Sequence, residues 1–401
     1  MSQEESPLRL ELFGRTDVGQ IREHNEDNFL VANLSTQLRG LKDEMRSVAL
    51  GPNGFVVGVC DGMGGAAAGE VASQLAVDVI FEQLLHGGAA QTRDDLARRL
   101  VSAIEYAGAQ IYREAQADRS RRGMGTTATI AAFLDRRVFI GQVGDSRAYL
   151  LRKGRLSLLT RDQSLVNQLI EAGQLTEEEA ETFEHNNIIL QALGTAETVQ
   201  VDLTYHDLCV GDVLMLCSDG LSGMIRNEEI AEVLSETESP LEACRELTER
   251  ANAAGGHDNI TVIVVRVVGG APEPAPGEIA FYQKYAIADS ADEDAAAADP
   301  SRLFDTIKTH RGDLGMEGGQ SLKVSHTMLG VMSPVGLDVH APGKKEEPRA
   351  DNKAHQGRFA RRHDVDDPVN LPTRALPPFV MGTILLSALV LAGLLGYLAI
   401  R

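Results

Sequence analysis

The chain has 401 residues, enough for two or three domains, and 43% of them are hydrophobic, which supports a sizeable core. Asp and Glu outnumber Lys and Arg by 58 to 38, and this formal net charge of −20 argues against a nucleic-acid partner. The four cysteines show no Cys-x-x-Cys spacing, so we expect buried thiols in a reducing compartment.

The first 160 residues are predicted to contain several strands and two long helices. Residues 8–32 read as two strands joined by a polar turn. Apolar residues recur at helical spacing over 69–85 and again over 94–117, so both segments are expected to be helices. Further strands are predicted at 126–134, 138–143, 146–151 and 155–159, the last two forming a hairpin.

Residues 160–195 interrupt this strand pattern with a short predicted helix at 164–172 and an acidic run. Beyond them the sequence predicts strands at 201–207, 213–217 and 260–268, and helices at 228–234 and 240–254. Gly255-Gly256 ends the second of these helices. Strands and helices that occur in blocks indicate an α+β fold.

Carboxylates stand repeatedly at the ends of apolar strands. The run 55–60 leads directly into Asp61-Gly62-Met63-Gly64-Gly65, and 213–217 leads into Ser218-Asp219-Gly220. A single Asp-Gly would also fit a plain turn. The same kind of position is occupied by Glu26, Asp27, Asp145 and Asp258. Because no Cys/His cluster accompanies them, these oxygens predict a site for Mg²⁺ or Mn²⁺ and not for Zn²⁺.

Six short motifs occur in a fixed order between residues 8 and 269. They are Arg22-Glu23-His24-Asn25-Glu26-Asp27, Asp61-Gly62-Met63-Gly64-Gly65, Gly123-Met124-Gly125-Thr126-Thr127, Gly144-Asp145-Ser146-Arg147, Ser218-Asp219-Gly220-Leu221 and Asp258-Asn259-Ile260-Thr261. With them, the region resembles the metal-dependent Ser/Thr protein phosphatases of the PPM (protein phosphatase 2C) family in their bacterial form. The resemblance implies a phosphatase domain over 8–269, built as a four-layer αββα sandwich of two antiparallel sheets flanked by helices.

The resemblance also implies a set of metal ligands. They are Glu26, Asp61, the carbonyl of Gly62, Asp145, Asp219 and Asp258. Two core ions, Mn²⁺ or Mg²⁺, are expected, with Asp61 bridging them. Asp61, Asp219 and Asp258 would hold the first ion, and Glu26, Asp61 and Gly62 the second. Asp145 with Asp219 would form a third, weaker site.

Other residues are expected to act on substrate or water. Arg22 matches the family's phosphate-binding arginine, and Asp27 is expected to orient a metal-bound water. Asn259 either positions Asp258 or a water, or serves only as a turn residue. Met63 replaces a histidine that is proposed to protonate the leaving group in some members, so a water or another acid must do so here. Gln163 replaces a common histidine of the flap, residues 160–195, where substrate selectivity is thought to reside.

The implied function is hydrolysis of phosphoserine and phosphothreonine on proteins by a metal-bridging water, opposing Ser/Thr kinases. The alternative is a pseudophosphatase, a membrane-tethered binding module that has lost turnover. Such a protein usually loses one of the ligand carboxylates. All of them are present here, which favours the enzyme.

The remaining residues differ in composition. Residues 270–377 predict a disordered linker that contains a basic stretch at 343–362. Phe379 to Ile400 is free of charge and would extend roughly 33 Å as a helix, so 378–401 is predicted to be a C-terminal transmembrane helix. With no signal peptide expected, the catalytic domain should be cytoplasmic on a single-pass anchor. Ala388, Ala392 and Gly396 are spaced for helix pairing, which would allow a dimer.

Overall fold

The structure is a computed structural model that describes residues 6–64, 68–86, 88–176, 179–180, 183 and 187–287. The predicted transmembrane helix and most of the predicted linker lie outside the described residues. Among the helices that are described, none is long and apolar enough to cross a membrane.

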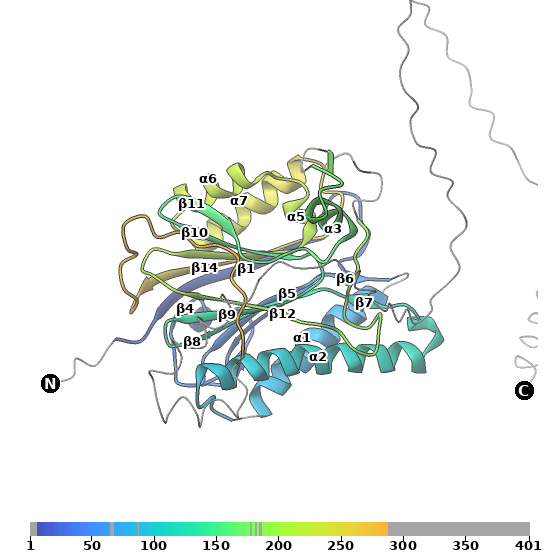
Figure 1. Ribbon diagram of the computed structural model, residues 1–401, viewed down its shortest axis with the longest axis horizontal. Coiled ribbons are helices and arrows are strands. Elements are labelled where there is room, and N and C mark those ends of the chain that lie inside the picture. Colours follow the sequence, from blue (N-terminus) through green and yellow to red (C-terminus); the bar gives the residue numbers. More distant parts are fainter. Residues whose placement is uncertain are drawn as a thin grey trace, which may run out of the picture. The chain divides into compact units, whose positions relative to one another are not determined.

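Two six-stranded antiparallel sheets form the centre of the domain (Figure 1). Sheet A has the order β11 (Arg155–Leu158), β10 (Arg147–Arg152), β13 (Val213–Cys217), β14 (Ile260–Gly269), β1 (Arg9–Asp17) and β4 (Ser47–Ala49). Sheet B has the order β12 (Asp202–Asp207), β9 (Arg137–Val143), β8 (Ala128–Leu134), β5 (Phe55–Cys60), β2 (Asn28–Asn33) and β3 (Leu38–Arg39). The strands predicted from the sequence are thereby confirmed.

Helices cover the outer face of each sheet (Figure 1). Helices α1 (Ala68–His86) and α2 (Arg93–Ala117) pack on sheet B, at the positions that the apolar spacing predicted. Sheet A is covered by α5 (Asp219–Ser222), α6 (Asn227–Glu236) and α7 (Pro240–Ala253). The predicted four-layer αββα arrangement is therefore observed.

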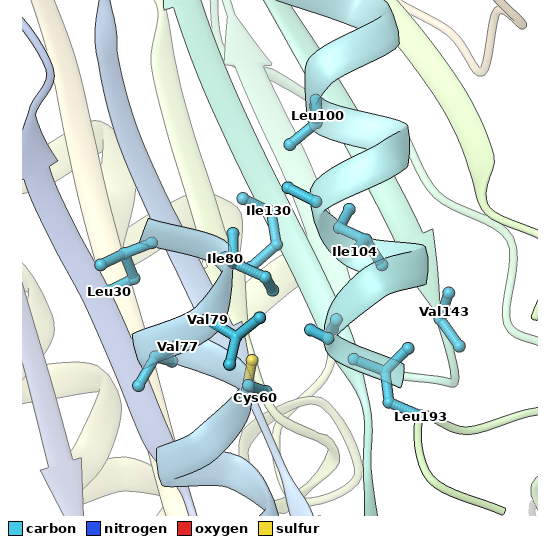
Figure 2. Close-up of a cluster of buried hydrophobic side chains, with 14 of the residues drawn as sticks. Leu30, Cys60, Val77, Val79, Ile80, Leu100, Ile104, Ile130, Val143 and Leu193 are labelled. Carbon is cyan, nitrogen blue, oxygen red and sulfur yellow. The ribbon is translucent and has the colours of Figure 1, made fainter. Parts of the chain in front are cut away.

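Three hydrophobic cores fill the spaces between the four layers. Neighbouring strand residues face opposite sides, so Val56 packs toward α1 and α2 while Val57 packs between the sheets. Figure 2 shows the core under the helices, where Ile80 of α1 and Ile104 of α2 lie against Ile130 of β8.

Helix ends follow the local sequence. The Thr92 side chain accepts a hydrogen bond from the backbone N–H of Asp95 and caps α2. Ser239 caps α7, and Pro240 stands at its first position, where a missing N–H is tolerated. The flap contains α3 (Leu165–Glu171), capped by Ser164 and close to the predicted range 164–172.

The strand register brings the carboxylates to one end of the sandwich. Asn28 at the start of β2 pairs with Cys60 at the end of β5. In the other sheet, Cys217 at the end of β13 pairs with Val262 near the start of β14. The residues before β2 and β14 and those after β5 and β13 therefore meet. Two short strands, β6 (Gly62–Met63) and β7 (Gly125–Thr126), pair beside them.

The structure differs from the prediction at the end of the domain. The linker was expected to begin at residue 270, but residues 270–287 pack on the domain. Ala280 is buried between the sheets, and Lys284 forms a bridge with Thr204 on β12. The proline-rich composition of this segment predicted that it would not pack in a core. The segment packs against the open edge of sheet B, and that edge forms only when the domain folds.

Candidate metal centre

Asp61 follows β5, and its backbone is fixed by two threonines. The N–H of Thr127 donates to the Asp61 carbonyl over 2.8 Å, and the Thr126 hydroxyl donates to the same oxygen over 2.8 Å. The N–H of Asp61 donates to the Thr127 hydroxyl over 2.9 Å. These contacts explain why two threonines follow Gly125, a role that the sequence alone did not reveal.

Asp27 is buried and joins three segments of the chain. Its Oδ2 accepts hydrogen bonds from the Ser218 hydroxyl over 2.8 Å and from the Thr261 hydroxyl over 2.7 Å. Its other oxygen, Oδ1, is buried and has no hydrogen-bond partner. Ser218 directly precedes Asp219, and Thr261 lies two residues after Asn259. The arrangement leaves one oxygen of Asp27 available to a ligand or water.

The strand-end carboxylates share one electrostatic environment. Burial, followed by the charges of Asp27, Asp219, Asp145 and Asp258, raises the pKa of Asp61 well above its usual range. The pKa of Asp219 is raised by burial and by Asp258, although a hydrogen bond to Asp61 opposes this. Burial and the charge of Asp219 raise the pKa of Asp145 to about 7. Like charges this close favour a cation among them.

Unpartnered oxygens provide a test of whether this donor set fits a metal. Asp145 and Asp219, like Asp27, each have an Oδ1 that is buried without a hydrogen-bond partner. Within the described residues, no group of three or more His, Cys, Asp or Glu side chains is placed so that it could hold an ion directly. The bare carboxylate oxygens and their mutual repulsion nevertheless match the ligands that Mg²⁺ and Mn²⁺ prefer.

Glu26 reaches the site because two glycines leave room for it. A Cβ on Gly69 of α1 would stand 2.7 Å from Glu26 Oε2, and one on Gly62 would collide with backbone oxygens of Glu26 and Gly69. Burial raises the pKa of the Glu26 carboxyl, while Arg22 acts against that shift. The structure thus places Glu26 beside Gly62, and their sharing of one ion stays a prediction. The sequence did not predict this role of Gly69, because a glycine near the start of a helix has no distinctive sequence pattern.

Asn259 holds the loop that carries Glu26. Its Oδ1 accepts from the N–H of Glu26 over 2.8 Å, and its Nδ2 donates to the carbonyls of Val18 and His24, each over 2.9 Å. The amide is thus fully used on backbone groups of residues 18–26. Its placement fits a positioning role for this loop more closely than contact with a water.

Arg22 lies at the mouth of the site. Its Nη2 is 2.7 Å from Asp258 Oδ2, and both side chains are partly exposed. The structure thus brings the predicted phosphate-binding arginine beside a predicted metal ligand. The remaining guanidinium donors can bind a phosphate.

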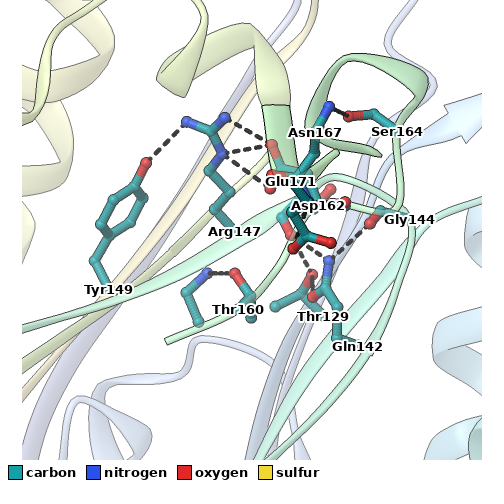
Figure 3. A network of polar contacts seen from close by, with 12 residues as sticks. Thr129, Gln142, Gly144, Arg147, Tyr149, Thr160, Asp162, Ser164, Asn167 and Glu171 are labelled. Atoms are coloured by element: carbon teal, nitrogen blue, oxygen red, sulfur yellow. Dashed lines mark hydrogen bonds and ion pairs between the residues drawn. The ribbon is translucent and has the colours of Figure 1, made fainter. Parts of the chain in front are cut away.

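The flap contacts residues on both sides of Asp145, and Figure 3 shows one of these contacts, between Asp162 and Arg147. Gly144 has a φ of +101°, a left-handed conformation that suits glycine, and its N–H donates to Gln163 Oε1 over 2.8 Å. On the other side of Asp145, Arg147 donates hydrogen bonds to the Asp162 carboxylate from Nε and Nη2, and the distance from Nη2 to Oδ2 is 2.6 Å. Gln163 therefore fixes the start of the Asp145 loop.

Comparisons with known proteins agree with this architecture. Residues 41–254, more than half of the chain, match the family model of Protein phosphatase 2C. The serine/threonine phosphatase stp of Listeria welshimeri is 38% identical over 251 residues, which cover 63% of this chain and 93% of that protein. The solved structure of the S. agalactiae serine/threonine phosphatase is 35% identical with a TM-score of 0.58, covering 64% of this chain and 99% of that one. The catalytic domain of PstP, solved with two manganese ions, is 34% identical with a TM-score of 0.54, covering 65% of this chain and 100% of that one.

The chain therefore belongs to the protein phosphatase 2C (PPM) family in its bacterial form. It is a protein-serine/threonine phosphatase. The family is metal-dependent, and the predicted resemblance is confirmed.

Proposed function

We propose that this phosphatase hydrolyses phosphoserine and phosphothreonine on proteins with two Mn²⁺ or Mg²⁺ ions at the cytoplasmic face of a membrane, where it opposes Ser/Thr kinases. The observation that carries the metal-dependent part is the set of buried, unpartnered oxygens on Asp27, Asp145 and Asp219. These oxygens belong to carboxylates that raise one another's pKa, and a divalent cation would remove that repulsion.

The proposed ligands come from the strand ends described above. The first ion would be held by Asp61, Asp219 and Asp258, the second by Glu26, Asp61 and the Gly62 carbonyl, and a weaker third by Asp145 with Asp219. When bound, the ions supply activation of a water nucleophile and neutralise charge on the phosphoryl oxygens.

The chain's own residues would position the reactants. Ser218 and Thr261 fix Asp27, whose free oxygen orients the attacking water. Arg22 would exchange its contact with Asp258 for the substrate phosphate. Met63 has no proton to give, so a water would protonate the leaving group.

A metal titration tests this assignment. We expect chelation to abolish turnover of p-nitrophenyl phosphate and added Mn²⁺ or Mg²⁺ to restore it. Calorimetry should show two tighter Mn²⁺ sites, and Asp145→Ala should keep both while lowering the rate. Full turnover in excess chelator would overturn the proposal, and loss of all Mn²⁺ binding in Asp145→Ala would exclude a separate third site.

The membrane location rests on the sequence of the last third of the chain. Residues 379–400 contain no charge, and basic residues of 343–362 and Arg374 lie on their N-terminal side. Four free, buried cysteines in the catalytic domain are compatible with the reducing cytoplasm. We propose a single-pass anchor with the phosphatase domain on the cytoplasmic face, and pairing through Ala388, Ala392 and Gly396 as a route to a dimer.

A further inference from the structure

The segment that follows β14, residues 272–287, is called the strap here. Figure 1 shows it in orange, crossing from sheet A over the edge of sheet B toward α2. Its first half is fastened to sheet A, where Arg152 Nη1 donates to Glu278 Oε1 over 2.7 Å. Arg152 is itself buried and paired with Asp212. A buried, paired arginine makes this a specific attachment.

The second half of the strap pairs with the edge of sheet B. The N–H of Tyr205 donates to the Gln283 carbonyl over 3.2 Å, and the N–H of Tyr285 donates to the Leu203 carbonyl over 2.8 Å. The Tyr285 ring packs edge-on against Phe139 and Tyr205, with ring centres 4.9 and 5.1 Å away. The strap therefore has a defined path over the domain.

A pocket of about 430 Å³ lies between the strap and the flap helix α3. This volume is within the range of small-ligand sites. Five amide side chains line it: Gln163, Asn167, Gln168, Gln191 and Gln200. The strap contributes Tyr282 and Lys284. The side chains of Gln163, Asn167 and Gln191 already make hydrogen bonds within the domain. The amides of Gln168 and Gln200 can both donate and accept, which is what the peptide groups of an extended chain require.

The charges around the pocket are largely matched. Asp162 pairs with Arg147 at 2.6 Å, and Asp202 pairs with Lys284 at 2.9 Å. Arg161 lies over the Tyr282 ring, 4.1 Å from its centre, and its Nη1 is 3.8 Å from Glu171 at the end of α3. Neither an anion nor a cation is favoured strongly, so the lining suits a neutral, polar peptide segment.

Three consecutive residues connect this pocket to the metal centre. Arg161 contacts the strap, and Gln163 holds Gly144 immediately before Asp145. Asp162 holds Arg147 two residues after Asp145 (Figure 3). The pocket wall thus contacts both sides of the Asp145 loop. A phosphoprotein whose phosphoryl group enters the metal centre must carry its flanking residues across neighbouring surface of this kind.

We propose that the pocket between the strap and α3 binds the polar peptide flank of the phosphoprotein substrate, and that Tyr282 is a specificity-determining residue. This inference rests on the proposed function. It assigns to the segment after β14 a role in substrate choice in addition to that of a connector.

Two substrates separate this role from a general effect on catalysis. We expect Tyr282→Ala to lower kcat/KM for a phosphothreonine peptide with polar flanks about tenfold, which corresponds to 1.4 kcal/mol, mainly through KM. Turnover of p-nitrophenyl phosphate, which has no peptide flank, should stay within about twofold. Tyr282→Phe keeps the ring over Arg161 and should restore most of the peptide activity.

Two further variants guard against an effect on folding. Phe281→Ala is the matched control, because Phe281 is 58% exposed and does not line the pocket. Gln168→Ala changes the opposite wall, on exposed α3 surface, and should raise KM for the peptide as Tyr282→Ala does. Unfolding temperatures of all variants should match the wild type, and if that of Tyr282→Ala falls, Gln168→Ala carries the test.

Three other outcomes would overturn the proposed subsite or the proposed function. An equal loss on both substrates would mean that the strap acts through the Asp145 loop, and would overturn the subsite. Unchanged kinetics on the peptide in Tyr282→Ala and Gln168→Ala would overturn it as well. Absence of metal-dependent p-nitrophenyl phosphate turnover in the wild-type protein would instead refute the proposed function, and this inference with it.

Discussion

Asp61 lies among like charges, and this placement affects both its chemistry and the stability of the fold. Its raised pKa means that the charged carboxylate is less favourable in the folded protein than in the unfolded chain. Residues that serve a site in this way often lower stability. The two threonines that hold the Asp61 backbone keep it in place against that repulsion.

Replacement of Asp61 should therefore separate activity from stability. Asp61→Asn keeps the shape and removes one charge, so we expect metal-dependent turnover to fall by orders of magnitude. In chelator, the same variant should unfold at a higher temperature, by about 2–4 °C for each kcal/mol of repulsion removed. Asp43→Asn, on an exposed 3₁₀ helix, is the control and should change neither. A lower unfolding temperature for Asp61→Asn would contradict the repulsion argument.

His206 on β12 is a second buried titratable group, and the charged residues that act on it, Arg152 and Asp207, are not among the proposed metal ligands. Burial and the Arg152 guanidinium lower its pKa from 6.5 to about 4, and its Nε2 has no hydrogen-bond partner. The folded protein thus holds His206 neutral. Between these two pKa values the unfolded chain binds more protons, so stability rises with pH and is fully present above about pH 6.5.

This gives a pH prediction with a defined sign. From about pH 7.5 to about pH 5, His206 alone should remove about 2 kcal/mol from the free energy of unfolding. His206→Phe should lack this component when urea unfolding is measured at both pH values. His257→Phe, at an exposed position, should retain it. An unchanged pH dependence in His206→Phe would show that His206 does not titrate as described.

The loop of residues 18–26 and strand β14 act together through one amide. Asn259 at the start of β14 makes three hydrogen bonds to this loop, which carries both Arg22 and Glu26. A loop is otherwise among the less constrained parts of a domain. The side chain of one strand-end residue therefore sets the place of two groups that the proposed mechanism uses.

Loss of this amide should affect both stability and substrate binding. For Asn259→Ala we expect the free energy of unfolding to fall by about 1–3 kcal/mol, because buried backbone groups lose their partners. We also expect a higher KM for p-nitrophenyl phosphate, since Arg22 is held less firmly. Asn227→Ala, at the exposed start of α6, should leave both values unchanged. A normal KM in Asn259→Ala would remove the positioning role.

The catalytic domain is stabilised by packed hydrophobic cores, whereas the sequence predicts a linker and a membrane anchor for the rest of the chain. The domain encloses three cores between four layers, and the strap extends it to residue 287. The predicted linker beyond the strap would hold the phosphatase near membrane substrates and raise their effective concentration. The predicted anchor remains a prediction, because residues 378–401 lie outside the described part of the chain.

Fractionation tests the anchor directly. Removal of residues 379–401 should transfer the protein from the membrane to the soluble fraction, with p-nitrophenyl phosphate turnover retained. Protease added to the outer face of intact cells should leave the catalytic domain uncut. A truncated chain that still sediments with membranes, or digestion of the domain from outside, would contradict the proposed location.

The sequence by itself determined the class of protein and most of the elements. Periodicity located α1, α2 and the strands, because a helix or strand that buries one face must repeat apolar residues at its own spacing. Carboxylates after apolar strands, in motifs of fixed order, indicated the family and the candidate ligands. These signals are local, so they survive without knowledge of the fold.

The tertiary structure decided which distant groups support the site. Ser218 and Thr261 hold Asp27, Gly69 makes room for Glu26, and Asn259 binds the loop in front of it. It also placed the strap against the edge of sheet B, where composition alone predicted a linker. Such contacts join residues far apart in the chain, and their energies depend on burial and geometry that arise only when the sheets and helices have packed.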